Sequence, residues 1–406
     1  NVGFEPQWLL IKNITTTVGD WYIYDSMRGV PTGSGDKELE ANDDAAEAAS
    51  SGGGQDWVDF NATGFTLKDN WEGVNQSGKN YIYMAIRRGS LFPPEDATKV
   101  FFQSTASAGT ALSVGFVPDF WLGGNRNGGA SMVMDRLRGS KYMSANSTAA
   151  EQNTNGVFSG ATTNTFTNNA AGGSRIEWLW KRAPSYFDVV AYSGDGSPND
   201  HAPTLTHNLG AVPEMVWCKR RNNTSNWAVS VKLGTGGVQA YLDANNGNVG
   251  TLSTTGPSNT WSDYFTSTQV IGDGGSGNQN HSPFPVTNLN ASGNQYIMYL
   301  FATAPGVSKV GSYTGNDNGS NSQTIDCGFS SGARFVLIKR YDGSGDWYVF
   351  DTVRGINTGD DPYLLLNTNG AEQTVWDGID PHSSGFSVTS STLNTNGSDY
   401  IFYAIA

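Results

Sequence analysis

The chain repeats one pattern of residues four times, and this repeat constrains its fold more than any other feature. Each copy ends in a glycine that shortly precedes an apolar run rich in aromatic residues. The four glycines are Gly78, Gly173, Gly293 and Gly397, spaced roughly 100 residues apart. Solenoid repeats are about 20–50 residues long, whereas about 100 residues is the size of one independent domain. The repeat therefore predicts four domains arranged like beads on a string.

We divide the chain into four modules at proline-containing joints: module 1 (1–90), module 2 (91–183), module 3 (184–305) and module 4 (306–406). Module 1 begins one strand later than the other copies, so we expect it to be N-terminally incomplete. Modules 2 and 3 are divergent copies, and module 3 carries an insertion rich in Gly, Asn and Ser. Short proline linkers are semi-rigid, which predicts an extended array with limited bending.

The local pattern within each module is that of β-strands. Short apolar runs such as Phe335–Ile338 suit strands covered on both faces, and aromatic, β-branched runs such as Trp347–Phe350 follow glycine-containing turns. Strand signals about every 10 residues favour a sandwich. We therefore predict an all-β protein of four tandem antiparallel β-sandwich modules, of jelly-roll or lectin-like type.

Three copies carry Asp-x-x-Arg-Gly, which we call the Asp–Arg mark. Its residues are Asp25, Arg28 and Gly29; Asp135, Arg138 and Gly139; and Asp351, Arg354 and Gly355. Module 3 has Val231 in place of the aspartate and lacks the Arg-Gly pair. One interpretation is a ligand-binding pair. The other, which recurrence in three copies favours, is a structural ion pair that holds the end of a strand to the following turn.

The same three copies carry Asn-x-x-x-Ala-Glu, which we call the Asn–Glu mark. Its polar residues are Asn42 and Glu47, Asn146 and Glu151, and Asn367 and Glu372. One interpretation is a carboxylate site. The other, which we favour, is an asparagine that caps a short turn, with the glutamate facing solvent or the arginine of the Asp–Arg mark. The second interpretation predicts that the two marks lie close together in each module.

Composition argues against several classes of partner. The formal net charge is −13 and no long basic run occurs, so the positive surface that nucleic acids and anionic membranes require is missing. No apolar run reaches the roughly 20 residues of a membrane helix. The two cysteines, Cys218 and Cys327, lie in different modules, and we expect no disulfide between them.

Motifs for catalysis are not apparent. The four histidines are scattered, and neither zinc-protease spacing nor a serine-hydrolase elbow occurs. We predict that the chain is not an enzyme and has no cofactor. Acidic and amide residues in the loops at 195–200 and 316–318 leave calcium binding open.

Binding specificity is expected where the copies differ. The insertion at 272–282 contains His281, and Trp261 and Tyr264 lie shortly before it. An aromatic ring beside an amide-rich loop is suited to stacking on a sugar, so these three residues are candidate glycan ligands. The alternative is that the loop packs against a neighbouring module or subunit.

The combined pattern, which runs from Gly3-Phe4 and Trp8 through the two marks to the final aromatic strand, resembles repeat modules in virion structural and tail-fibre-like proteins of tailed bacteriophages, notably marine and cyanobacterial ones. The resemblance is clear in modules 1 and 4 and weakest in module 3. It implies sandwich modules of lectin or laminin-G type, and adhesion or structure rather than catalysis.

We therefore predict a non-enzymatic virion structural protein, a tail fibre or fibre-like appendage used for host attachment or particle decoration. Its location would be the virion or the extracellular space. Its partners would be other virion proteins, copies of itself or a host surface glycan, without nucleic acid or membrane insertion. The alternatives are a carbohydrate-binding array of a secreted bacterial adhesin and a polysaccharide-degrading enzyme, which would need two carboxylates in one groove.

Overall fold

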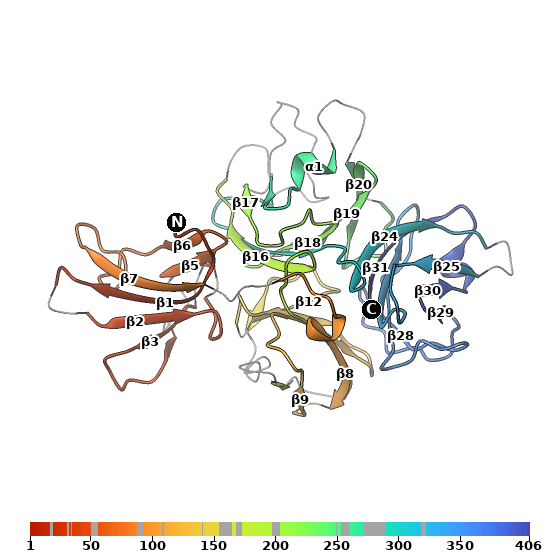
Figure 1. Ribbon diagram of the computed structural model, residues 1–406, viewed down its shortest axis with the longest axis horizontal. Coiled ribbons are helices and arrows are strands. Elements are labelled where there is room, and N and C mark those ends of the chain that lie inside the picture. The colour runs from red at the N-terminus through yellow and green to blue at the C-terminus, as the bar shows by residue number, and fades with distance from the viewer. Residues whose placement is uncertain are drawn as a thin grey trace.

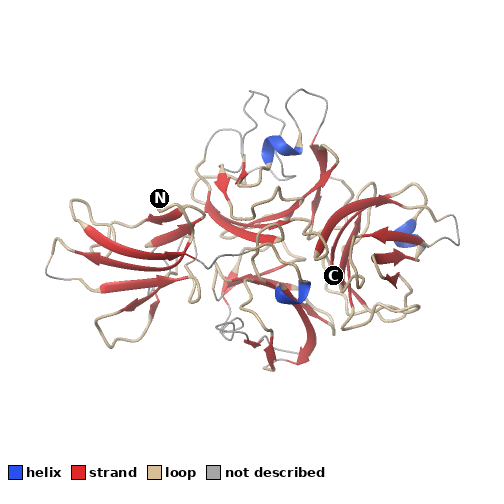
Figure 2. Cartoon of the chain, viewed as in Figure 1, coloured by secondary structure: helices blue, strands red, loops and turns tan. Residues whose placement is uncertain are grey.

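The computed structural model describes residues 1–16, 19–30, 32–33, 35–49, 56–87, 92–107, 109–139, 141–153, 165–167, 173–196, 204–248, 250–252, 260–271, 289–317 and 322–406. These residues form an all-β protein of antiparallel sheets, which confirms the predicted fold class (Figures 1 and 2). The helices among them are single turns: η1 (Ala97–Lys99), α1 (Trp261–Tyr264) and α2 (Ser391–Asn394). None of these helices could cross a membrane.

Each module contains one large antiparallel sheet and a small sheet packed against it. In module 1 the large sheet has the order β4-β3-β2-β1-β7 and the small one is β5-β6. The strands are β1 (Pro6–Asn13), β2 (Trp21–Asp25), β3 (Lys37–Glu40), β4 (Ala48–Ala49), β5 (Val58–Asn61), β6 (Gly64–Leu67) and β7 (Tyr81–Arg87).

In module 2 the large sheet has the order β13-β12-β11-β10-β15-β8 and the small one is β14-β9. The strands are β8 (Phe101–Ser107), β9 (Ala111–Ser113), β10 (Phe120–Asn125), β11 (Met132–Asp135), β12 (Lys141–Ser144), β13 (Gln152–Asn153), β14 (Thr165–Thr167) and β15 (Ser174–Trp180).

Modules 3 and 4 follow the same plan. In module 3 the orders are β16-β23-β18-β19-β20-β21 and β17-β22. The strands are β16 (Phe187–Ser193), β17 (Leu205–Thr206), β18 (Met215–Arg220), β19 (Ala228–Leu233), β20 (Gly236–Tyr241), β21 (Gly250–Leu252), β22 (Gln269–Val270) and β23 (Gln295–Phe301). In module 4 the orders are β24-β31-β26-β27-β28 and β25-β30-β29. The strands are β24 (Ser308–Thr314), β25 (Gln323–Asp326), β26 (Phe335–Arg340), β27 (Tyr348–Asp351), β28 (Tyr363–Leu365), β29 (Ile379–His382), β30 (Gly385–Val388) and β31 (Asp399–Ile405).

Strand register fixes which residues of the four modules are equivalent. The last strand of each module, β7, β15, β23 or β31, pairs with β1, β10, β18 or β26 respectively. The pairs that define the register are Trp8 with Ile86, Phe120 with Trp180, Met215 with Phe301, and Phe335 with Ile405. In modules 2–4 the last strand also pairs with the first strand of its module, and in module 1 the described residues place no strand there.

The two faces of each large sheet pack against different things. In module 4, Tyr400 and Phe402 of β31 face the small sheet and join a core that belongs to module 4 alone. Their neighbours Ile401, Tyr403 and Ile405 point the other way, because side chains alternate along a strand. These three residues belong to a second core, to which modules 2, 3 and 4 all contribute.

The shared core shows that the expected beads on a string are wrong for modules 2–4. Aromatic rings meet across every pair of these modules. The centroids of Phe120 and Tyr299 are 4.7 Å apart, those of Phe301 and Tyr403 are 5.1 Å apart, and Phe101 lies 5.5 Å from Phe335. We call these three modules, residues 91–406, the ring (Figure 1). A sheet with two apolar faces must be covered on both, and here each module covers the others.

Module 1 projects to one side of the ring and meets it through polar groups (Figure 1). The carboxylate of Glu5 binds Arg182 in two hydrogen bonds of 2.6 and 2.7 Å. Arg221 of module 3 donates to the carbonyl of Thr32 at 2.7 Å. Gly29 lies so close to module 2 that a Cβ atom there would come within 3.2 Å of the Cα atom of Gly139. The contact between module 1 and the ring is thus made by loops rather than by an apolar sheet face.

The two cysteines are free, as expected, and both are buried. Burial raises the pKa of the thiols of Cys218 and Cys327 to about 12. Cys218 belongs to the core beneath the large sheet of module 3. Both residues therefore serve as small apolar groups in the interior.

Candidate functional site

The Asp–Arg marks lie at the joints between modules. In all three copies the arginine Nε donates to the aspartate, at 2.7 Å in module 1, 2.5 Å in module 2 and 2.6 Å in module 4. The aspartate also accepts from the arginine backbone N–H, which closes the turn. The arginine Nη2 returns to a strand carbonyl two residues before the aspartate. The mark therefore ties a strand end to its turn, as the structural interpretation predicts.

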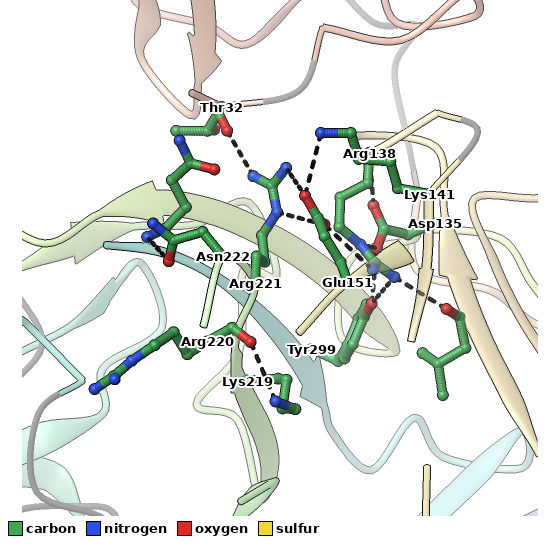
Figure 3. Close-up of polar contacts among 12 residues, drawn as sticks. Thr32, Asp135, Arg138, Lys141, Glu151, Lys219, Arg220, Arg221, Asn222 and Tyr299 are labelled. Atoms are coloured by element: carbon green, nitrogen blue, oxygen red, sulfur yellow. Dashed lines mark hydrogen bonds and ion pairs between the residues drawn. The ribbon is translucent and has the colours of Figure 1, made fainter. Parts of the chain in front are cut away.

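The joint between modules 2 and 3 adds a residue from the neighbouring module to this pair (Figure 3). The hydroxyl of Tyr299, on β23, donates to Asp135 at 2.7 Å and accepts from Arg138 at 2.8 Å. The side chains of Asp135 and Arg138 are fully buried. Two opposite charges out of water need such additional hydrogen bonds, because their desolvation is costly. The folded joint therefore requires module 3 to complete the polar environment of module 2.

The glutamate of the Asn–Glu mark completes the same joint (Figure 3). Glu151 binds Arg221 of module 3 in a bidentate pair of 2.9 and 3.0 Å, and its backbone N–H donates to the Arg221 carbonyl at 2.7 Å. It also lies 3.8 Å from Arg138 and 3.3 Å from Lys141. Burial alone would raise the pKa of Glu151, but Arg221, Arg138 and Lys141 lower it to about 2. The carboxylate is thus held in its ionised form.

The joint between modules 4 and 2 repeats this arrangement with different side chains. The indole N–H of Trp178, at the position equivalent to Tyr299, donates to Asp351 at 3.2 Å. The guanidinium of Arg354 lies 5.4 Å from the centroid of the same indole ring. Glu372 binds Arg126 of module 2 at 2.7–3.1 Å, and its backbone N–H donates to the Arg126 carbonyl at 3.0 Å. The same two marks are thus used twice around the ring.

The joint between modules 3 and 4 keeps the backbone contact but has lost the charges. The N–H of Asn248 donates to the Tyr341 carbonyl at 2.5 Å, in the position of the Glu151 and Glu372 contacts. Val231 stands where the other joints have an aspartate, and Val231 and Tyr403 both belong to the shared core. The absence of the mark from module 3 is therefore compensated by apolar packing at this joint.

Tryptophans add a further repeated contact between modules. The indole N–H of Trp227 donates to the Ser144 carbonyl of module 2, and that of Trp347 donates to the Tyr241 carbonyl of module 3, both at 2.8 Å. Trp227 directly precedes β19, and Trp347 directly precedes β27. The far end of each of these strands is the place where the aspartate of the Asp–Arg mark occurs in the repeat. Both donors and both acceptors occupy equivalent places, which makes the ring a head-to-tail arrangement of modules.

The two marks lie close together in every copy, as expected. The arginine and glutamate side chains are 4.0 Å apart for Arg28 and Glu47, 3.8 Å in module 2 and 3.4 Å for Arg354 and Glu372. The expectation of a local turn cap is wrong for the asparagines of modules 1 and 4. Asn42 accepts from the backbone N–H of Trp21, and Asn367 accepts from that of Trp347 at 2.9 Å, so each connects two strands.

Asn146 and module 3 depart from that strand-connecting contact. The side chain of Asn146 donates to that of Asn369 in module 4 at 2.5 Å. In module 3, Asp243 takes the place of the asparagine and accepts from the backbone N–H of Trp227 at 2.9 Å. Its second oxygen accepts from Asn226, which stands where modules 1 and 4 have an aspartate. The exchange of Asp and Asn preserves the same two hydrogen bonds.

A model of the family described as "Domain of unknown function (DUF7483)" matches residues 1–88 and 93–406. The chain belongs to the DUF7483 family. Comparison with curated proteins found no match, and comparison with solved structures found none. The gap between the two matched stretches of the DUF7483 chain falls where module 1 meets the ring. The second stretch contains the three modules that share one core.

The expected glycan site is not supported by the structure. Trp261 and Tyr264 lie on α1 and are 0% and 1% exposed, within the core between the sheets of module 3. The indole N–H of Trp261 donates to the Pro213 carbonyl at 2.7 Å. His281 and the insertion at 272–282 lie outside the described residues. Because neither ring can reach a sugar, the assignment of Trp261 and Tyr264 as glycan ligands was wrong.

A polar cleft of about 370 Å³ lies between module 1 and modules 2 and 3. Its polar lining includes hydroxyl, amide and carboxylate groups, one guanidinium and one imidazole: Glu5, Asp59, Asn61, Thr63, Arg182, Asp188, Ser193, Thr206, His207 and Asn208. Arg182 binds Asp188 at 2.5 Å as well as Glu5, so these two carboxylates share one cation. Burial lowers the pKa of His207. Sequence reasoning missed this cleft because its walls come from modules far apart in the chain.

The residues that could hold a metal are only partly described. Within the described part of the chain, no group of three or more His, Cys, Asp or Glu side chains could bind a metal ion. Residues 197–200 and 318 of the two calcium-loop candidates lie outside it. Of the described remainder, Asp195 accepts from the amide of Asn290 at 2.6 Å, and the backbone N–H of Asp317 donates to the Asn394 carbonyl at 2.9 Å.

Proposed function

We propose that the chain is a non-enzymatic structural protein of an extracellular particle, a virion appendage of the tail-fibre type. The observation that carries the proposal is the use of both repeated marks in packing. At the joints of the ring, Asp135 with Arg138 and Asp351 with Arg354 are fully buried between modules. Charged groups enclosed in this way support a rigid body and do not meet a substrate.

The surface chemistry supports the same proposal. Only 15% of residues are charged, and 51 are glycine. Such a chain carries a surface rich in amides and hydroxyls with an acidic net charge of −13, which suits a long-lived particle in the extracellular environment. The resemblance to phage virion modules adds the particle type, with other virion proteins or copies of the chain itself as partners.

The test is the presence of the chain in purified particles. Intact virions are banded in a density gradient, treated with protease-free washes at high salt, and their proteins are identified by mass spectrometry. We expect the chain at a fixed stoichiometry relative to the capsid protein. Its recovery only in the soluble lysate, with particles that lack it, would rule out a structural role in the virion.

A second candidate function, glycan binding, is favoured by the cleft between module 1 and the ring. Its volume suits a small ligand, and its hydroxyl, amide and carboxylate groups are those that hydrogen-bond sugars. The Thr206→Trp substitution would fill the cleft. If the cleft binds glycan, this variant should lose binding on a glycan array while its melting temperature stays close to that of the parent. Retained binding would exclude the cleft, and the absence of binding by the parent would exclude this function for the glycans tested.

A further inference from the structure

Module 1 exposes the sheet face that the other three modules bury. On the last strand, the equivalent residues of the ring are at most 1% exposed: Ile176, Trp178 and Trp180; Ile297, Tyr299 and Phe301; Ile401, Tyr403 and Ile405. In module 1 these positions hold Ile82, Met84 and Ile86, which are 45%, 52% and 48% exposed. Three adjacent large apolar side chains on one strand are a patch of the kind that marks an interaction surface.

The patch continues across the neighbouring strands of module 1. Trp8 and Leu10 of β1 and Trp21 and Ile23 of β2 are half-buried on the same face. Their counterparts in module 4, Phe335, Leu337, Trp347 and Val349, are all buried in the shared core. The alternate residues of β1 and β2 in module 1 face its small sheet and are buried as in the other modules. The outer face of the module 1 sheet is therefore uncovered across β1, β2 and β7, whereas the inner face is exposed on β7 at Tyr83, which is 55% exposed.

Module 1 also retains the polar groups that form a joint in the ring. By register, Trp21 is equivalent to Trp227 and Trp347, whose indole N–H groups donate to a carbonyl of the preceding module. Glu40 is equivalent to the two residues that supply this carbonyl, Ser144 and Tyr241. Module 1 thus contains both the donor and the acceptor of one contact, on the neighbouring strands β2 and β3.

The backbone contact at the joints has the same two halves in module 1. Glu47 is the counterpart of Glu151, and Ile14 is the counterpart of Arg221, because each follows the strand equivalent to β18. Ile14 is 56% exposed. In the ring these positions are joined by a hydrogen bond of 2.7 Å from N–H to carbonyl. With isoleucine in the place of arginine, the corresponding joint of module 1 would keep the backbone contact but lack the bidentate ion pair of Glu151 and Arg221.

We propose that module 1 assembles three copies of this chain by forming, between chains, the ring that modules 2–4 form within one chain. Each copy would place Ile82, Met84 and Ile86 in a common core. Trp21 of one copy would donate to the Glu40 carbonyl of its neighbour, and the Glu47 N–H of that neighbour would donate to the Ile14 carbonyl of the first copy. A head-to-tail interface of this kind closes after three subunits when the rotation between modules is that of the ring.

The contact of module 1 with its own ring leaves this face free. Gly29 meets Gly139, which belongs to the Asp–Arg mark of module 2. Gly139 contacts Gly29 although module 2 is packed within the ring. Gly29 holds the same place in module 1, so its contact with Gly139 is compatible with module 1 packing in a second ring formed by three chains. The shared core of modules 2–4 is already complete, so the occupant of the module 1 face has to come from elsewhere.

The first test measures the mass of the full chain in solution. Sedimentation equilibrium at micromolar concentration should give three times the chain mass of 43.4 kDa. The double variant Ile82→Glu, Met84→Glu should sediment as a monomer with the circular dichroism of the parent. The matched control is Val375→Glu in module 4, because Val375 is 79% exposed and distant in the repeat from this face; it should remain trimeric. A monomeric parent, a dimer, or a double variant that remains trimeric would overturn the proposal.

The second test does not depend on disruptive variants. Cysteines at Glu47 and Ile14 in one chain should form disulfides between chains, because the corresponding backbones in the ring are within hydrogen-bonding distance. Oxidation should give a covalent trimer on a non-reducing gel, and a chain with Glu47→Cys alone should give none. The native cysteines are buried and should not interfere. A product that stops at the dimer, or no crosslinked product, would contradict a ring of three.

Discussion

The last strand of module 4 and that of module 1 have nearly the same sequence, YIFYAI against YIYMAI, but they lie in different surroundings. Ile401, Tyr403 and Ile405 are in the shared core, whereas Ile82, Met84 and Ile86 are about half exposed. Full burial of such a side chain contributes about 1.5–3 kcal/mol. The ring therefore gains from its second face a stabilisation that module 1, as a single copy, does not have.

The same difference is seen in the charged groups. The side chains of Asp135 and Arg138 are 0% exposed, and those of Asp25 and Arg28 are 16% exposed. The two pairs have the same local geometry, so local sequence does not distinguish them. Comparing the two pairs therefore distinguishes the stabilisation that the ion pair gives to its own turn from the stabilisation that it gives to a joint between modules. Four experiments can test this distinction.

The largest difference is expected between Arg138→Ala and Arg28→Ala. Removal of Arg138 leaves Asp135 charged in a fully buried site, which should lower the free energy of unfolding of the ring by about 3–5 kcal/mol. Removal of Arg28 leaves a carboxylate within reach of water, and the loss in module 1 should be about 1 kcal/mol. Chemical denaturation followed by hydrogen exchange in each module measures both. Equal losses would show that the joint adds nothing to the turn.

The pH dependence should differ in sign between the ring and module 1. The pKa of Glu151 is lowered to about 2, so its stabilisation of the ring is present above the unfolded pKa of about 4.5 and is lost as the pH falls towards 2. The loss should amount to about 3 kcal/mol. In module 1, burial raises the pKa of Asp36 to about 8 despite backbone hydrogen bonds from Val58 and Trp57. Module 1 should therefore lose stability as the pH rises from about 4 to 8.

Hydrogen exchange at a series of pH values can follow the two regions separately in the full chain. The Glu151→Gln variant should flatten the acid response of the ring, and Asp36→Asn should flatten the alkaline response of module 1. A common pH profile for both regions, in the parent and in the variants, would be inconsistent with this assignment.

A smaller effect is expected from the aromatic partner at each joint. Tyr299→Phe removes a donor to the buried Asp135 and should cost about 1–3 kcal/mol. Tyr403→Phe is the matched control, because Tyr403 occupies the equivalent position at the joint where Val231 replaces the aspartate. Its effect should be below that of Tyr299→Phe. Thermal denaturation of the two variants measures both losses of stability. A larger loss for Tyr403→Phe would contradict the assignment of the buried ionic contact to the joint between modules 2 and 3.

The smallest effect concerns the contact of module 1 with the ring. Gly29 has φ of 103°, and a Cβ atom there would press against the Gly139 backbone. Gly29→Ala should destabilise this contact by about 1 kcal/mol or somewhat more. Faster proteolysis of the segment between module 1 and the ring, with an unchanged melting temperature of the ring, is the expected result. Gly3→Ala is a control with positive φ but open space around the glycine.

The sequence by itself determined the strands, the antiparallel sandwiches and the internal geometry of the Asp–Arg mark. These features depend on residues near each other in the chain or on patterns that recur with the fold: alternating apolar side chains, glycines in turns, and an ion pair with a spacing of three residues. The proximity of the two marks was predictable for the same reason. The asparagines were misassigned as local caps because their partners lie about 20 residues earlier, across a strand pair.

Only the tertiary structure decided how the modules meet. The apolar face of each last strand is visible in the sequence, but its cover comes from modules about 100 and 200 residues away, and apolar burial has no direction that would identify the partner. Trp261 and Tyr264 appeared to be surface residues because their neighbours are polar, although a single helical turn carries both rings into the core. Modules 1 and 4 thus carry the same pattern, and the packing of the chain determines that one buries its second face while the other exposes it.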